Sequence, residues 1–285
     1  MKTNIFCSEV VTMNALNNFF IEMTAKCCNQ HCKHCYIDFP QYKKIQDYID
    51  MEIIKNALND SMNEDIKCIY LSGAEPMGPP DFNAILRMCL KRSNVCICTN
   101  GSYINEKKAR FLKKVEEESC NEIIFKLSLD HFDEIKNDNI RYRGAYRQTV
   151  FAVKHLVKYN FTPIITVTNY YNEPHNILEE GLKQVFAKID FDIDKSHIQI
   201  NPWYDKNSDI DSEMHDNNLP LDCKSGRILT SSGVYTCPFL ANDYRGRCGS
   251  NLKDYTRRTT LETNFCSTCL KSSNAIFGID YLKFD

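Results

Sequence analysis

Segments typical of buried strands alternate with segments of helical periodicity through the first 202 residues of the chain. Short apolar runs predict strands at residues 19–23, 66–71, 95–99, 123–129, 163–168 and 197–201. Helices are expected between them at residues 51–62, 81–92, 105–118, 143–158 and 176–188. In the fourth helix, Val150, Val153 and Val157 recur at steps of three and four and therefore share one face. The alternation predicts parallel βα units, which place ligand-binding loops at the carboxyl ends of their strands.

The length and charge of the chain limit its class and its partners. With 285 residues, 43% of them hydrophobic, the chain is long enough for one large α/β domain and too apolar to be disordered. Its 35 Lys+Arg and 37 Asp+Glu residues give a net charge of −2, which creates no long-range field for nucleic acid or an anionic membrane. We therefore expect neither nucleic acid nor a membrane among its partners.

The chain carries 15 cysteines, an odd number that cannot pair completely in disulfides. No run of 18 apolar residues could span a bilayer, and the N-terminus lacks the apolar core of a secretory signal. We therefore expect a cytoplasmic protein, in which clustered cysteines are more often metal ligands than disulfide partners. Residues 205–220 are polar and are interpreted as a linker between a domain at residues 1–204 and a small second module at residues 221–285.

Cys28, Cys32 and Cys35 lie close together in the sequence directly after the first predicted strand. Three thiolates are too few to close a tetrahedral structural zinc site, although His31 or His34 could supply a fourth ligand. A [4Fe–4S] cluster held by three cysteines instead keeps one iron with an open position. The spacing alone leaves both kinds of metal centre open.

The C-x3-C-x2-C spacing and the aromatic Tyr36 directly after it resemble the cluster motif of the radical S-adenosylmethionine (radical SAM) superfamily. The resemblance implies an α/β fold, a partial (β/α)6 TIM-like barrel, in which Cys28, Cys32 and Cys35 hold the cluster and Tyr36 lies beside SAM. Cys27 could replace Cys28 only with a longer first spacing. In that family a reduced donor such as flavodoxin or ferredoxin supplies the electron that splits SAM into methionine and a deoxyadenosyl radical. An exposed iron also implies oxygen sensitivity and an anaerobic setting.

Two further strand ends carry turns that resemble SAM-binding turns of this family. Gly73, Ala74 and Glu75 belong to an SGAEP turn similar to the GGEP turn, in which backbone carbonyls and the Glu receive the SAM ammonium. Ala74 departs from the family by replacing the second glycine, whereas Gly73 permits close backbone approach. Asn100 belongs to a TNG turn, whose Asn-Gly pair readily takes left-handed conformations.

The fourth and fifth strand ends add polar residues that match the family pattern. Ser128 and Asp130 place two hydrogen-bonding side chains on one face, where the resemblance implies contact with the SAM ribose. Arg141 has the family spacing of an arginine that approaches the SAM carboxylate, and it is preferred to Arg143. A planar guanidinium suits this task because it meets a carboxylate with two hydrogen bonds. Asn169 is a further residue expected to face SAM.

A second cysteine set lies near the C-terminal end of the sequence. Its members are Cys223, Cys237, Cys266 and Cys269. The C-x2-C pair in this set suits a zinc ribbon as well as an iron–sulfur cluster. Beside a radical SAM core, the set resembles the SPASM and twitch extensions, which bind auxiliary [4Fe–4S] clusters. The twitch-like type, with one cluster held by four cysteines, is the better match because further cysteines of the full SPASM pattern are missing.

Most other cysteines are expected to be structural. Cys248 is expected to be a small buried residue. Its alternatives are a hydrogen-atom donor, as in radical SAM epimerases, or a replacement for one of the four ligands. Core positions are predicted for Cys68, Cys89, Cys96, Cys98 and Cys120.

The substrate is expected near the end of the sixth strand. Trp203, Tyr204 and Asp205 are candidates for a binding wall there, with packing between the modules as the alternative. The leading function is oxidation, dehydrogenation or epimerisation at a C–H bond of a small polar metabolite such as a sugar, an aminocyclitol or another natural-product precursor. The alternative substrate is a ribosomally synthesised peptide, which would be epimerised or cross-linked. A non-enzymatic zinc-binding module is a third hypothesis.

Overall fold

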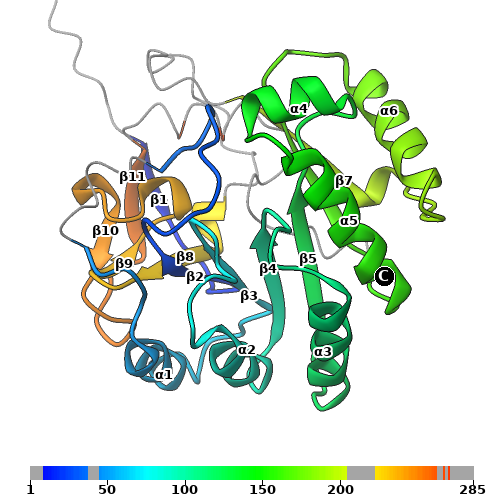
Figure 1. Cartoon of the computed structure of the whole chain (residues 1–285). Helices are drawn as coiled ribbons and strands as arrows, with labels where there is room; N and C mark the ends of the chain where they lie inside the picture. Colours follow the sequence, from blue (N-terminus) through cyan, green and yellow to red (C-terminus); the bar gives the residue numbers. More distant parts are fainter. Residues whose placement is uncertain (1–8, 38–44, 204–221, 262–265, 267–268, 270–285) are drawn as a thin grey trace, which may run out of the picture.

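The computed structural model describes residues 9–37, 45–203, 222–261, 266 and 269. Within these residues, parallel strands β2 to β7 lie side by side in chain order (Figure 1). Their bounds are β2 Asn18–Thr24, β3 Cys68–Gly73, β4 Asn94–Thr99, β5 Ile123–Ser128, β6 Ile164–Asn169 and β7 Ile198–Pro202. The predicted α/β fold and the partial (β/α)6 barrel are confirmed, and each predicted strand is present.

Helices connect these strands at the predicted places. They are α1 Met51–Asp60, α2 Phe82–Leu90, α3 Glu106–Glu117, α5 Ala145–Lys158 and α6 His175–Ala187. A further helix, α4 Glu134–Ile140, lies between β5 and α5, where the sequence pattern predicts none. The helix forms because Asp133 caps it, with a side-chain oxygen that accepts a hydrogen bond from Lys136 N.

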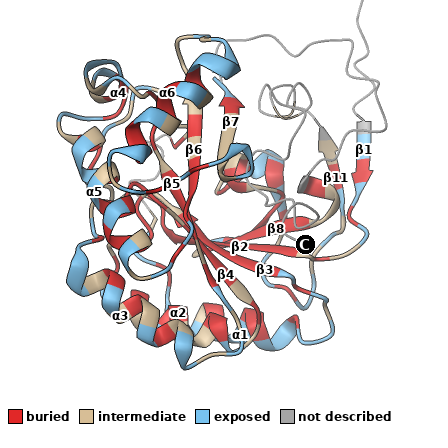
Figure 2. Ribbon diagram, turned by 90° about the vertical axis from the view of Figure 1, so that its right-hand side faces the viewer, coloured by how far each residue is buried: buried red, intermediate tan, exposed pale blue. Residues whose placement is uncertain are grey.

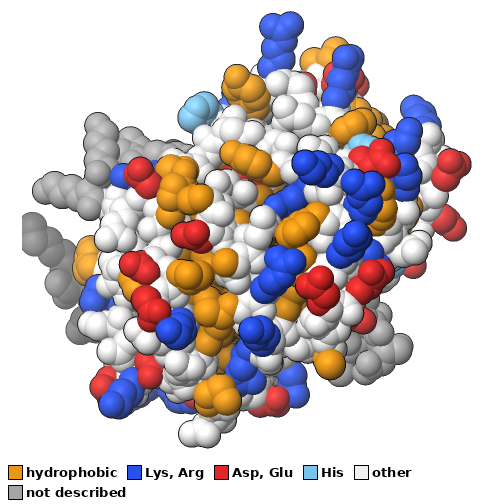
Figure 3. Space-filling view, turned by 60° about the horizontal axis from the view of Figure 1, so that its bottom comes forward, with side chains coloured by type: hydrophobic (Ala, Val, Ile, Leu, Met, Phe, Trp, Pro, Cys, Tyr) orange, Lys and Arg blue, Asp and Glu red, His pale blue; other side chains and the backbone are white. Residues whose placement is uncertain are grey.

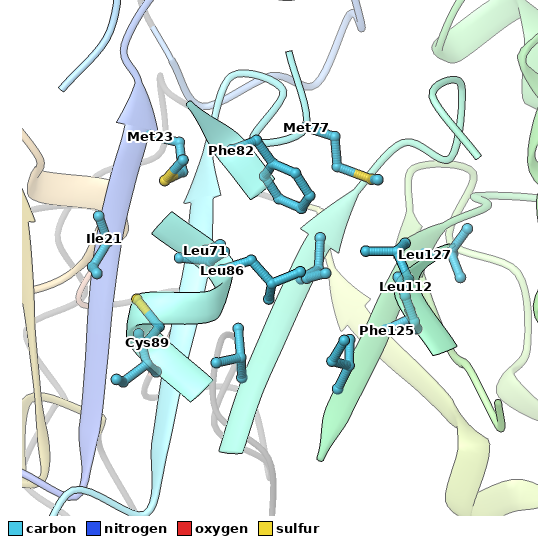
Figure 4. Packing of buried hydrophobic residues seen from close by; sticks show 14 of the residues in the cluster. Ile21, Met23, Leu71, Met77, Phe82, Leu86, Cys89, Leu112, Phe125 and Leu127 are labelled. Carbon is cyan, nitrogen blue, oxygen red and sulfur yellow. The ribbon is translucent and has the colours of Figure 1, made fainter. Parts of the chain in front are cut away.

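The helices cover the outer face of the curved sheet (Figures 1 and 2). Successive strand residues point to opposite faces, and the outward set is apolar. Ile21, Leu71 and Phe125 from the strands join Leu86 and Leu112 from the helices in one buried cluster (Figure 4). Burial of this apolar surface stabilises the barrel and fixes which side chains remain for the inner face.

The inner face changes from apolar to polar toward the carboxyl ends of the strands. Near the amino ends, Phe20 stacks on Tyr70 with ring centroids 4.4 Å apart. Further along, Lys126 is only 5% exposed. At the carboxyl ends, Thr166 of β6 and Asn201 of β7 face the interior cavity described below. The parallel register therefore gathers polar side chains at the end of the sheet where ligands are expected.

The sheet continues beyond β2 into the C-terminal part of the chain. Strand β8 (Gly226–Thr230) pairs parallel with β2, and β9 (Gly233–Tyr235) and β10 (Arg247–Gly249) follow antiparallel. A separate pair joins β1 (Glu9–Thr12) to β11 (Arg258–Leu261). Parts of the predicted domain and of the predicted second module thus share one sheet. The division at residues 205–220, which lie outside the described residues, stays a prediction.

Two surface properties bear on partners. None of the helices in the described ranges is long and apolar enough to cross a membrane. On the face shown in Figure 3, Lys and Arg side chains are interspersed with Asp and Glu side chains. This face therefore carries no uniform charge of one sign.

Candidate active site

A cavity of about 210 Å³ opens at the carboxyl ends of the parallel strands. Cys28, Cys32 and Cys35 line it together with the turns that follow β3 and β4 and the inner face of β5 to β7. Phe239, from the C-terminal part of the chain, also lines it. The three cysteines of the predicted cluster motif therefore share one cavity with the predicted SAM-binding turns.

The three cysteines lie in the loop that follows β2. Cys28 Sγ accepts a hydrogen bond from Gln30 N at 3.4 Å. Burial raises the pKa of the Cys28 and Cys32 thiols and that of Cys35 to about 11, and a bound metal centre would favour their thiolate forms. No three His, Cys, Asp or Glu residues in the described ranges are placed around a single metal ion. A [4Fe–4S] cluster held by three cysteines would bind each of them to a different iron and keep one iron open for a ligand.

The turn after β3 approaches the cysteine loop closely. Gly73 has φ of +109°, and a Cβ there would lie 2.4 Å from Thr24 O. Only glycine permits both this left-handed conformation and this contact. Gly73 and Ala74 line the cavity, as expected for residues that offer backbone groups to a ligand.

Glu75 holds the neighbouring turn. Its buried carboxylate accepts hydrogen bonds from Thr99 Oγ1 at 2.7 Å, Asn100 N at 2.9 Å and Met77 N at 3.1 Å. Burial raises the pKa of this carboxyl, and these hydrogen bonds offset part of the rise. Glu75 is not among the described residues that line the cavity, so its contact with the SAM ammonium stays a prediction.

Asn100 connects the end of β4 to the cysteine loop. Its Nδ2 donates a hydrogen bond to Asn29 Oδ1 at 2.9 Å and lies 3.9 Å from Cys28 Sγ. The next residue, Gly101, has φ of +81°, as the Asn-Gly pair predicts. The TNG turn therefore supports the cysteine loop and also lines the cavity through Asn100.

Asp130, Arg141 and His34 form a buried charged cluster in the cavity wall. Asp130 Oδ2 accepts a hydrogen bond from Arg141 Nη1 at 2.9 Å and lies 2.6 Å from His34 Nε2, while Oδ1 accepts one from Thr168 N at 2.8 Å. Burial alone would raise the pKa of Asp130, but the neighbouring charges of His34 and Arg141 outweigh it and hold that pKa below its ordinary range. Asp130 therefore anchors both Arg141 and His34 in the cavity wall.

Arg141 keeps one donor for a ligand. Its Nε is buried and has no hydrogen-bond partner among the described residues. Because buried donors are nearly always satisfied, this atom fits an acceptor on a bound molecule such as the carboxylate of SAM.

The remaining predicted SAM residues divide into two groups. Ser128 and Tyr36 line the cavity, and the Tyr36 ring packs edge-on against Phe239 with centroids 5.3 Å apart. Asn169 instead closes the turn after β6, because its Oδ1 accepts a hydrogen bond from Glu173 N at 2.9 Å and its Nδ2 donates one to Glu173 O at 2.8 Å. It is absent from the lining formed by the described residues.

The inner wall of the cavity was missed by the sequence analysis. Cys98, Lys126, Thr166 and Asn201 contribute to it. Asn201 is only 6% exposed, and its Oδ1, like Thr166 Oγ1, is buried without a hydrogen-bond partner in the part of the chain that the structure describes. The available signal was the polar residue at every second position near the carboxyl ends of β5 and β6.

The core predictions for cysteines are partly wrong. Cys68, Cys89 and Cys96 are buried as expected. Cys98, however, lines the cavity because its β4 position points inward, and Cys120 is exposed in the connection after α3.

Neither Cys248 nor Trp203 is among the described residues that line the cavity. Cys248 is 9% exposed and joins the apolar core, with Sγ 3.5 Å from Gly246 O. Trp203 is 43% exposed and packs against Tyr170 at 5.1 Å between ring centroids. Tyr204 and Asp205 lie outside the described residues, so their role stays a prediction.

The C-terminal cysteine set is brought together by the β8–β9 hairpin. Cys223 precedes β8 and Cys237 follows β9, so both stand at the open end of the hairpin. Burial and the neighbouring Cys266, Cys269 and Cys223 raise the pKa of the Cys237 thiol well above its ordinary value. The three other cysteines therefore lie near Cys237, although no three of the set are grouped around a single metal ion in the described residues.

Comparisons with known proteins agree with this geometry. The sequence model of the radical SAM superfamily matches residues 24–180. No curated protein matches the sequence. The native anSMEcpe structure with bound AdoMet is similar over 84% of this chain and 79% of its own, with TM-score 0.62 and 16% identity. The same protein with AdoMet and the Cp18Cys peptide matches over 84% and 78%, again with TM-score 0.62 and 16% identity.

A second solved protein has a similar fold. Methylornithine synthase (PylB) matches over 84% of this chain and 79% of its own, with TM-score 0.53 and 14% identity. At such identities these structures support the fold alone. The superfamily match is different, because it spans more than half of the chain and contains the cysteines and turns that line the cavity. The chain therefore belongs to the radical SAM superfamily.

Proposed function

We propose that this radical SAM enzyme abstracts a hydrogen atom from a C–H bond of a small polar metabolite, which is thereby oxidised or epimerised. The supporting observation is a cavity that joins the three motif cysteines to a polar inner wall. Asn201 Oδ1 and Thr166 Oγ1 in that wall lack partners among the described residues. Since buried polar atoms are nearly always hydrogen-bonded, a metabolite with hydroxyl or amino groups would complete them.

Residues at the rim of the cavity suit SAM. When bound, the cluster and SAM supply a deoxyadenosyl radical for hydrogen abstraction. Cys28, Cys32 and Cys35 would hold the cluster, and the Gly73 backbone allows a ligand close approach. Arg141 would bind the carboxylate of SAM through its unpartnered Nε, held in place by Asp130.

We also propose that the C-terminal part forms a twitch-like module with an auxiliary [4Fe–4S] cluster. Its ligands would be Cys223, Cys237, Cys266 and Cys269. Support comes from the mutual proximity of these thiols and from Phe239, which follows Cys237 closely in sequence and lines the cavity beside Tyr36. A cluster closed by four cysteines leaves no iron free for substrate but can exchange electrons.

A ribosomally synthesised peptide is the second candidate substrate. The observation that favours it is the exposed Trp203, which packs against Tyr170 directly after the lining residue Pro202. Exposed aromatic rings at the mouth of a cavity suit peptide side chains.

Mass spectrometry under anaerobic conditions tests the proposal. The reconstituted enzyme is incubated with dithionite, SAM and either polyol or aminocyclitol metabolites or candidate peptides. We expect a mass or stereochemical change in a metabolite, with deoxyadenosine released in step with it. The Cys28/Cys32/Cys35→Ala variant serves as the control and should produce no deoxyadenosine. Coupling to a peptide alone would favour the second candidate, and a zinc-containing protein that leaves SAM intact would contradict both.

We propose a cytoplasmic enzyme that receives electrons from a flavodoxin or ferredoxin and binds neither nucleic acid nor a membrane. Reduced flavodoxin is expected to replace dithionite in supporting deoxyadenosine formation. Failure with both flavodoxin and ferredoxin would contradict this choice of donor.

A further inference from the structure

Arg227 is a completely buried cation beside the C-terminal cysteine set. It lies on β8 and is 0% exposed. Its Nη1 donates hydrogen bonds to Gly226 O at 2.7 Å and Cys223 O at 2.9 Å, and its Nη2 donates one to Arg257 O at 2.8 Å. Its Nε is buried without a partner among the described residues.

The charge of Arg227 lacks an opposite charge in the described part of the chain. Carbonyl oxygens satisfy some of its donors, but no described carboxylate forms an ion pair with it. The nearby Glu64 is already paired with Arg257. By contrast, the buried Arg141 has Asp130. Burying an uncompensated charge is costly, so a negative group is expected near Arg227.

The proposed auxiliary cluster would supply that negative charge. Arg227 bonds the carbonyl oxygen of Cys223, which is only a few covalent bonds from the Sγ of the same residue. A cluster held by four thiolates is anionic and becomes more negative on reduction. A fixed buried cation stabilises the reduced form more than the oxidised form, because electrostatic attraction is strong where water is excluded.

We propose that Arg227 is a positioning residue for the auxiliary cluster: it fixes the backbone of Cys223 and raises the reduction potential of the cluster through its positive charge. This inference rests on the proposed function of the C-terminal cysteines. It assigns to Arg227 a role that its hydrogen bonds to carbonyl groups alone would not give it.

The test isolates the auxiliary site in the full chain. Cys28, Cys32 and Cys35 are replaced by Ala, so that only the C-terminal set can hold a cluster. Iron, sulfide and thermal unfolding are measured in this parent and in its Arg227→Met and Arg227→Lys forms. The midpoint potential is then determined by a redox titration followed by electron paramagnetic resonance.

We expect the Arg227→Met form to have a more negative midpoint potential than the parent, and the Arg227→Lys form to lie closer to the parent. The control is Arg92→Met, because Arg92 also donates to backbone carbonyls, those of Ser61 and Glu64, but bonds no cysteine carbonyl. Its midpoint should equal that of the parent. If Arg227→Met is not folded, Arg227→Gln against Arg227→Lys makes the same comparison of neutral with charged side chains.

Iron content and midpoint potential together separate failure of the auxiliary cluster from failure of the role of Arg227. A parent without iron would show that the proposed auxiliary cluster is wrong, and the inference with it. A parent with iron whose midpoint is unchanged in Arg227→Met would overturn the inference while the cluster stands. If folded Arg227→Met binds no iron, retention of iron by Arg227→Lys supports the role of the charge, and loss from both overturns it.

Discussion

The two cysteine sets are built in different ways. Cys28, Cys32 and Cys35 belong to one loop, which neighbouring strand ends support through Gly73 and Asn100. The second set draws on both sides of the β8–β9 hairpin and on Cys266 and Cys269 farther along the chain. The first set is therefore a property of local sequence on a βα scaffold, whereas the second exists only once the hairpin and the later segment have come together.

The buried arginines beside the two cysteine sets also differ, because among the described residues only one of them is paired with a carboxylate. Arg141, near the first set, is paired with Asp130 before any ligand binds. Arg227, beside the second, is bonded to carbonyl groups. A site with its charges already paired is prepared to bind a neutral or zwitterionic ligand, whereas an unpaired cation favours an anionic one.

The largest expected effect separates the two sets by function. Replacing Cys28, Cys32 and Cys35 with Ala should abolish deoxyadenosine formation, whereas replacing Cys223 and Cys237 should leave reductive SAM cleavage in place and impair the change in substrate. Iron should fall from about eight to about four per chain in either variant. Iron analysis and chromatography of deoxyadenosine measure both effects. Equal loss of SAM cleavage in both variants would contradict the division of roles.

The sequence predicted the barrel and its rim because both depend on local patterns. Strand and helix periods identified each βα unit, and Gly73 and Gly101 have the conformations that their turns require. Asp130 and Arg141 were placed near SAM, but their ion pair was not foreseen, because it brings together the ends of two different elements.

The inner wall and the C-terminal sheet were less predictable. Cys98 occurs in a strand that looks apolar along the chain, and in β7 Asn201 alternates with isoleucines; in both strands only the register shows which side chains face the cavity. The parallel pairing of β8 with β2 joins residues some two hundred positions apart, as in Phe19 opposite Arg227, and no local signal specifies it.

Breaking the ion pair between Asp130 and Arg141, near the first cysteine set, should have the next largest effect. Asp130→Asn leaves Arg141 buried and charged without a carboxylate, which should cost roughly 3–5 kcal/mol of stability and weaken SAM binding. Urea denaturation and calorimetric titration with SAM measure the two effects. Asp243→Asn is the matched control, because Asp243 pairs with the more exposed Arg245 in the C-terminal part and its loss should cost less than about 1 kcal/mol. Similar losses in both variants would contradict the argument.

Glu22 on β2 contacts Asn242 in the C-terminal part of the chain. Its buried carboxyl predicts that the stability of the protein depends on pH. Its side chain accepts a hydrogen bond from Asn242 Nδ2 at 2.7 Å, and burial raises its pKa from 4.5 to about 7. Because the folded protein holds this proton more tightly than the unfolded chain, the stability associated with Glu22 is highest below pH 4.5 and falls as the pH rises to about 7. Glu22→Gln should remove this fall and stabilise the protein at pH 8 by up to about 3 kcal/mol. Denaturation curves from pH 4 to 8 test it, and parallel curves for both proteins would contradict it.

The smallest effects are expected for Cys248 and Cys98, two cysteines outside both sets. Cys248→Ala removes a sulfur from the apolar core and should cost about 1 kcal/mol, with product formation and its stereochemistry unchanged. Cys98→Ala alters the cavity wall itself and should change the yield of product per deoxyadenosine released, although SAM cleavage continues. Thermal unfolding and product analysis measure both variants. A loss of stereochemical inversion in Cys248→Ala alone would make Cys248 the hydrogen-atom donor, which would require the core around it to open toward the substrate during turnover.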